Sequence, residues 1–246
     1  MAVVSPAQLD TSTETDSIRN EASRTAPPLQ SGDRLGVAEF HQRYAQHPSI
    51  KKAELVEGVV YVSSPVYTSH SKPHAQLVFW AGLYLAGTPS VQMGDNQSVR
   101  LDNDNEVQPD ICLWQDNSVG KQISVTQKGL LLGSPDLVIE VAASSAAYDL
   151  HQKLRVYQRS GVREYLVFVA YEQEARWFHL VDGEFQPITA DDEGVLRSRL
   201  FPGLWIHPDH VWQNDFAAMQ TLLQAGLDSP EHVEFVKPAP PAEPSP

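Results

Sequence analysis

Two acidic residues and one lysine are spaced as a catalytic site would require. Asp110 opens the apolar run DICLW, and Glu140 lies within the second apolar run LVIEVA. Lys153 follows in a segment of helical character. Burial of a glutamate between Ile139 and Val141 in a core strand would cost several kcal/mol of desolvation free energy, unless a cation or a hydrogen-bond donor compensates this cost. We therefore interpret Asp110, Glu140 and Lys153 as a candidate catalytic group.

The chemistry of this group follows from its residue types. If the two apolar runs are neighbouring strands, about 4.8 Å apart, both carboxylates can bind one hard cation such as Mg²⁺ or Mn²⁺. The carbonyl of Val141 could be a third ligand. Lys153, with Asp149 four residues before it on the same helix face, would add a positive charge near the attacking water and a phosphate. Such a site supports hydrolysis of a phosphodiester by metal-bound water.

Several residues have an ordinary structural reading beside the functional one. Asp110 could be a turn aspartate, and Lys153 a solvated lysine or an ion-pair partner of Asp149. Glu54 could be an extra acid near the metal, although a surface hairpin residue is the more common case. His74 is a less certain site residue and could be a helix cap or a core histidine. The Trp and Tyr residues are interpreted as core rather than as a platform for stacking bases.

The elements that must position these residues are read from apolar periodicity and from turn residues. We expect tails at both ends, two hairpins and a mixed set of helices and strands. The Leu200–Ile206 segment is expected as an irregular apolar lid over the core, and residues 115–134 as a polar, mobile linker. The remaining expected elements are helices at 36–46, 74–86, 148–160 and 211–225, hairpins at 53–63 and 176–188, and strands at 91–101, 107–114, 136–143 and 164–169.

This order predicts a mixed α/β fold, with a mixed central sheet flanked by helices. Residues 1–33 and 237–246 are poor in large apolar residues or rich in proline, so we interpret them as disordered tails around one domain at 34–236. The buried helix at 74–86 and the LFPGLWI segment could also form a homodimer surface.

Composition narrows the function classes. The 246 residues carry a formal net charge of −13, which disfavours avid non-specific DNA binding but not a nuclease whose cations are bound metals. The one cysteine, Cys112, allows no intramolecular disulfide, and a reducing cytoplasm fits. No apolar run is long enough for a membrane span, and the first residues lack the pattern of a signal peptide.

The same residues resemble a known family. The proline–aspartate pair at 109–110 and the acid that closes an apolar strand some thirty residues later are similar to the PD-(D/E)xK nuclease superfamily. Within it, the chain resembles the Uma-type family of restriction-endonuclease-like proteins over about residues 45–215. The pieces that carry this resemblance are ELVEG at 54–58, His74, PD at 109–110, PDLVIEV at 135–141, YDLHQK at 148–153, Tyr157 and GVREY at 161–165.

The resemblance implies a restriction-endonuclease-like fold and a divalent-metal-dependent endonuclease that acts on nucleic acid, most simply DNA. Asp110 and Glu140 map to the metal carboxylates. The lysine usually found two residues after the second acid is replaced by Ala142, and Lys153 from the following helix takes its role. The chain also departs from the family pattern at Leu166, where tryptophan is usual, and at Val169, where aspartate commonly ends the strand.

Two other functions remain open. A catalytically inactive member that acts as a binding or regulatory module is favoured by the negative charge and by Val169. A glycosidase would also use paired carboxylates, but it has no role for the lysine.

Overall fold

The computed structural model describes residues 26–63, 65–115 and 123–237, and their architecture is mixed α/β as predicted. The described strands form two six-stranded sheets and one two-stranded sheet. The central sheet has the order β12-β11-β10-β9-β6-β3, in which β9 and β10 are parallel and the other neighbours are antiparallel. The second sheet, β2-β1-β5-β4-β8-β7, was not separated from the first by the sequence pattern.

The bounds of these elements are as follows. The central sheet contains β3 (Val91–Asp95), β6 (Ile111–Gln115), β9 (Leu137–Ala142), β10 (Glu164–Val169), β11 (Glu174–Val181) and β12 (Glu184–Ile188). The other strands are β1 (Ala53–Val56), β2 (Val59–Val62), β4 (Val99–Arg100), β5 (Glu106–Val107), β7 (Ile123–Val125), β8 (Leu131–Gly133), β13 (Leu196–Arg197) and β14 (Trp205–Ile206). The helices are α2 (Val37–Gln46), α3 (Thr68–Gly87), the π-helix η1 (Tyr148–Lys153), α4 (Leu154–Ser160), α5 (Pro208–Trp212), α6 (Phe216–Leu227) and α7 (Pro230–Phe235).

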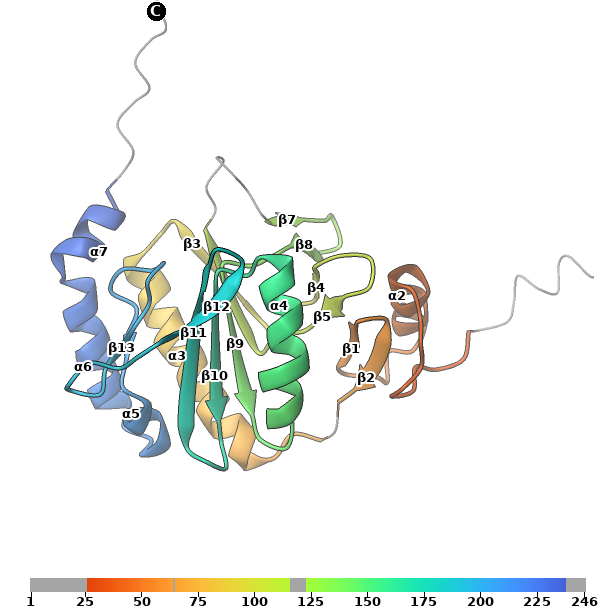
Figure 1. Cartoon of the computed structure of the whole chain (residues 1–246), viewed down its shortest axis with the longest axis horizontal. Coiled ribbons are helices and arrows are strands. Elements are labelled where there is room, and N and C mark those ends of the chain that lie inside the picture. The colour runs from red at the N-terminus through yellow and green to blue at the C-terminus, as the bar shows by residue number, and fades with distance from the viewer. Residues whose placement is uncertain (1–25, 64, 116–122, 238–246) are drawn as a thin grey trace, which may run out of the picture.

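The central sheet is covered on both faces, with α3 behind it and α4 in front in the view of Figure 1. Side chains of a strand alternate between faces, so the odd-numbered residues of β9 pack with α3. The even-numbered Val138 and Ala142 pack with α4 instead. Glu140 shares their parity and therefore points toward η1 and α4. Burial on both faces explains why β9 and β10 are nearly continuous apolar runs.

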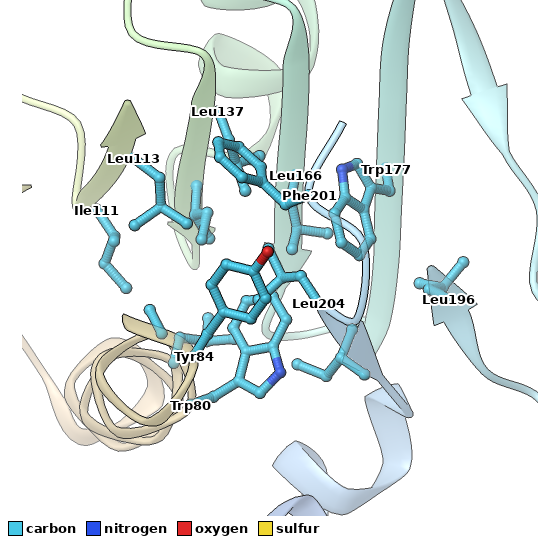
Figure 2. Packing of buried hydrophobic residues seen from close by; sticks show 14 of the residues in the cluster. Trp80, Tyr84, Ile111, Leu113, Leu137, Leu166, Trp177, Leu196, Phe201 and Leu204 are labelled. Atoms are coloured by element: carbon cyan, nitrogen blue, oxygen red, sulfur yellow. The ribbon is translucent and has the colours of Figure 1, made fainter. Parts of the chain in front are cut away.

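Aromatic side chains of α3 hold the C-terminal part of the chain against the sheet (Figure 2). The Trp80 indole N–H donates to the carbonyl of Trp205 at 2.8 Å, and the Tyr84 hydroxyl donates to the carbonyl of Pro202 at 3.0 Å. Phe201 and Leu204 join the same cluster, so the 200–206 segment does cover the core as expected. These apolar side chains are therefore buried within one chain, and the homodimer surface expected there stays a prediction.

Several predicted boundaries are wrong, each for a local reason. Helix α3 begins at Thr68 rather than at His74, because the polar TSHSKP sequence and Pro73 conceal its first turns. The strand expected at 107–114 is two strands in different sheets, interrupted at Pro109, which has no N–H to donate to a ladder. The strand expected at 91–101 is likewise divided, at Asn96, whose φ is +49°.

The region expected as a mobile linker contains structure. Strands β7 and β8 lie within it and pair with each other, whereas residues 116–122 lie outside the described part of the chain. The C-terminal helix expected at 211–225 is instead two helices, α5 and α6, and a further helix, α7, follows them. Asn214, with a φ of +59°, separates the first two, and Asp215 caps α6 by accepting from the Ala218 N–H at 2.9 Å.

The N-terminal boundary of the fold also differs from the prediction. Leu29 is buried, and the N–H of Gly32 donates to the carbonyl of Val60 at 2.9 Å, so residues 26–33 pack on the β1–β2 hairpin. The rest of the two predicted tails, at 1–25 and 238–246, lies outside the described residues. No helix in the described ranges is long and apolar enough to cross a membrane.

Candidate active site

The register of two core strands brings Asp110 and Glu140 together. Strands β6 and β9 are antiparallel, with Ile111 opposite Ile139, and one further step of this register places Asp110 opposite Glu140. The Asp110 N–H points at the Glu140 Oε2 atom over 3.4 Å. The Val141 N–H donates to the Asp110 Oδ2 atom at 2.9 Å. Opposed residues of an antiparallel pair project to the same face, so the two carboxylates converge on the side covered by η1.

Lys153 completes the predicted group. The Lys153 Nζ atom lies 2.8 Å from the Glu140 Oε1 atom and 3.6 Å from the Asp149 Oδ1 atom, and all three side chains are buried. The Tyr157 hydroxyl also donates to the Glu140 Oε1 atom, at 3.0 Å. Lys153 ends the π-helical turn η1, a helical form that often accompanies functional sites. Its reading as a solvated surface lysine is wrong.

Glu54 belongs to the same cluster. Its Oε1 atom lies 3.0 Å from the Lys153 Nζ atom and accepts from the N–H of Gln108 at 2.8 Å. The side chain is buried in β1, so its interpretation as a surface hairpin residue is wrong. Lys153 therefore contacts a carboxylate from each six-stranded sheet, since Glu54 lies in one sheet and Glu140 in the other.

Two residues at the site were missed by the sequence reasoning. The Lys52 Nζ atom lies 2.8 Å from the Asp110 Oδ1 atom, and the His70 Nε2 atom lies 2.9 Å from the Asp110 Oδ2 atom. His74, which was singled out instead, contacts the Asp95 carboxylate at 2.9 Å and reaches only the backbone oxygen of Asp110. The sequence did contain one signal for His70. It lies four residues before His74 and therefore on the same face of a helix that begins earlier than expected.

A cavity of about 340 Å³ is lined by most of this group, namely Lys52, Glu54, His70, Asp110, Glu140, Asp149 and Lys153. Asp110 and Glu140 are 2% and 3% exposed and lie at its base. The cavity is also lined by the largely exposed Tyr67 and Tyr171. The interpretation of all tyrosines as core residues is wrong for these two.

Burial and charge shift the ionisation of the group. Burial raises the pKa of Glu140 to about 8, against the opposing charge of Lys153. Burial also acts to raise the pKa of Asp110, but the hydrogen bond from His70 and the charge of Lys52 outweigh it and lower that pKa. Burial disfavours the charged form of Lys153, yet Glu140 and Glu54 raise its pKa well above the usual value. Lys153 therefore carries its positive charge at neutral pH.

The donor set fits a hard divalent cation in part. Mg²⁺ is commonly held by one or two carboxylates and completes its shell with water and substrate oxygens, which Asp110 and Glu140 can satisfy. Within the described ranges, no group of three or more His, Cys, Asp or Glu residues is arranged to hold a metal. The Asp110 oxygens are engaged by Lys52, His70 and a backbone N–H. A cation that binds Asp110 would therefore compete with the positive charge of Lys52 for the Oδ1 atom.

The chain matches one protein family and is similar to a solved structure. A family model described as "Uma2: Putative restriction endonuclease" matches residues 37–209, which include every site residue named above. Among solved structures, the chain is similar to a "putative nuclease belonging to DUF820" from Anabaena variabilis ATCC 29413, with 12% identity and a TM-score of 0.49. That similarity covers 70% of this chain and 90% of the other. No protein of curated function matches the sequence.

Proposed function

The chain belongs to the Uma2 family, described as "Putative restriction endonuclease", and on this premise we propose that it hydrolyses phosphodiester bonds of nucleic acid with the help of Mg²⁺ or Mn²⁺. The observation that carries the proposal is the meeting of Asp110, Glu140 and Lys153 in one cavity. The proposed substrate is DNA.

Each residue has a role in this proposal. Asp110 and Glu140 would hold the cation, which supplies an activated water and stabilises charge on the phosphate. Lys153 fixes the orientation of the Glu140 carboxylate through their 2.8 Å contact and offsets its negative charge. Glu54 positions Lys153 from the other side at 3.0 Å. Lys52 is 24% exposed, so its ammonium group can turn from Asp110 toward a substrate phosphate.

The experiment compares matched carboxylate variants of the full chain. Supercoiled plasmid and a labelled single-stranded oligonucleotide are incubated with Mg²⁺, Mn²⁺ or EDTA, and metal binding is followed by calorimetry. Asp110→Asn and Glu140→Gln should abolish metal-dependent cleavage and weaken metal binding. Asp136→Asn is the control, since Asp136 bonds the Gln115 N–H at 2.9 Å and does not line the cavity. Equal cleavage by wild type and Glu140→Gln would reject the assignment.

One observation favours a second candidate, an inactive nuclease-fold module that binds nucleic acid. The Asp110 carboxylate is already neutralised by Lys52 at 2.8 Å, and the Glu140 carboxylate by Lys153 at 2.8 Å. A site that has replaced its metal with lysines would have this arrangement. It would show oligonucleotide binding that is unaffected by EDTA, with no cleavage in any metal.

A further inference from the structure

The exposed tyrosines of the chain gather at one place. All eight tyrosines lie in the described ranges, and Tyr67 and Tyr171 are the two that remain largely exposed, at 72% and 67%. Both line the cavity that contains Asp110 and Glu140. Val66, 67% exposed, lines it as well. Large exposed apolar groups that cluster beside a cavity commonly mark a binding site.

The two rings come from separate, well-anchored parts of the backbone. Tyr67 immediately precedes α3, and its carbonyl accepts from the N–H groups of His70 at 3.0 Å and Ser71 at 2.9 Å. Tyr171 lies in the turn between β10 and β11, beside Ala170, whose N–H donates to Ala142 at 2.8 Å. A tyrosine ring on a fixed backbone has few torsions to immobilise, so it offers contact area at a small entropic cost.

We propose that Tyr67 and Tyr171 stack on unpaired bases and that the substrate is therefore a single strand, or a strand extruded from a duplex. This rests on the proposed function, because the stacked strand would deliver its phosphate to Asp110 and Glu140. The two carboxylates are almost fully buried at the base of the cavity. A cavity of about 340 Å³ is at the small end of ligand sites and has room for a nucleotide rather than for a paired duplex.

Charge supports the same substrate class. Tight binding to the phosphates of duplex DNA needs many lysine and arginine contacts, and this chain has a formal net charge of −13. Stacking of a base on an aromatic ring does not depend on net charge and tolerates any base sequence. The affinity of this protein for a nucleic acid would therefore come mainly from stacking. Its dependence on salt concentration should be shallow.

The test measures binding without cleavage. Fluorescence anisotropy in EDTA compares the full chain with a labelled oligodeoxythymidine, an oligouridine and a DNA duplex. Tyr67→Ala and Tyr171→Ala should each weaken single-strand binding about tenfold, as expected for the loss of one base stack. Tyr67→Phe and Tyr171→Phe should bind like wild type. Phe216→Ala is the control, since Phe216 is a partly exposed aromatic residue that does not line the cavity.

The outcomes separate this inference from the proposed function. Tighter binding to the duplex than to both single strands, or alanine variants that bind like wild type, would overturn the stacking role even if the protein cleaves DNA. Tyrosine-dependent binding of single strands without metal-dependent cleavage would keep the stacking role and reject the nuclease. Preference for the DNA or the RNA strand would identify which nucleic acid supplies the unpaired bases, and either result supports the inference.

Discussion

The Nζ atom of Lys153 lies 2.8 Å from the Oε1 atom of Glu140, and both residues are 3% exposed. Neither charge would be tolerated alone at this depth, because desolvation of an unpaired ion costs several kcal/mol. The pair is therefore a condition for folding as well as a candidate part of the catalytic group. The two roles can be separated by experiment.

Lys153→Met should destabilise the fold strongly. The variant leaves the Glu54 carboxylate, and above about pH 8 the Glu140 carboxylate as well, buried without its cation. Removal of one partner from a buried pair costs about 3–5 kcal/mol. Urea unfolding measures the change. The double variant Glu140→Gln/Lys153→Met should recover part of the loss, because it no longer buries the Glu140 charge. A single variant as stable as wild type would show that Lys153 is solvated in solution.

Lys52→Gln should bind Mn²⁺ more tightly than wild type. The Lys52 ammonium group holds the Asp110 Oδ1 atom that the cation needs, and it is partly exposed, so its removal should improve the affinity by about fivefold, or about 1 kcal/mol. Calorimetric titration gives the affinity. Lys51→Gln is the control, because the Lys51 side chain is exposed and its ammonium group donates to the Pro48 carbonyl rather than to a carboxylate of the cavity. A weaker affinity in Lys52→Gln would mean that Lys52 does not compete with the metal.

Metal binding should rise with pH. The pKa of Glu140 is raised to about 8 by burial, so at lower pH a cation must displace its proton. The apparent affinity should then increase by about tenfold per pH unit up to that value and level above it. Calorimetry across this range, in buffers of different ionisation enthalpy, reports both the affinity and the released proton. Asp136→Asn should keep this profile, and a flat profile in wild type would place the Glu140 pKa elsewhere.

Glu164 should make the free energy of unfolding depend on pH, independently of metal binding. Its buried carboxylate accepts from the Trp177 indole at 3.0 Å and from the Ser198 hydroxyl at 2.8 Å, and neither partner belongs to the catalytic group. Burial raises its pKa from 4.5 to about 7 despite these donors. A carboxyl group whose pKa is higher in the folded chain than in the unfolded chain stabilises the fold while it is protonated. This contribution is fully present below the pKa of the unfolded chain and is lost as pH rises through the pKa of the folded chain.

The free energy of unfolding contributed by Glu164 should therefore fall by about 3 kcal/mol between the two pKa values. Urea unfolding at several pH values tests this by comparing wild type with Glu164→Gln, which should lack that part of the decline. Glu174→Gln, at an exposed position, is the control and should follow wild type. If Glu164→Gln declines in parallel with wild type, the carboxyl group titrates equally in the folded and unfolded chains.

Much of the local structure could be predicted because it depends on neighbours in the chain. Continuous apolar residues around Glu140 indicated a strand buried on both faces, and Gly161, with a φ of +81°, ended α4 as its sequence position suggested. The convergence of Asp110 with Glu140 needed only the assumption that their strands pair. These features depend on burial and on backbone preferences over a few residues.

The rest required contacts between distant segments. Nothing near Lys52 indicates that it reaches Asp110, and the four-residue spacing of His70 from His74 shows a shared helix face but not what either histidine contacts. Both contacts with Asp110 depend on how the β1–β2 hairpin and α3 lie on the central sheet. Nor does sequence tell the exposed Tyr67 from the buried Tyr157. The sequence by itself determined which residues can carry charge and which strands are buried. Only the tertiary structure decided which charges face one another, because electrostatic pairing and desolvation depend on distances between segments that the chain order does not specify.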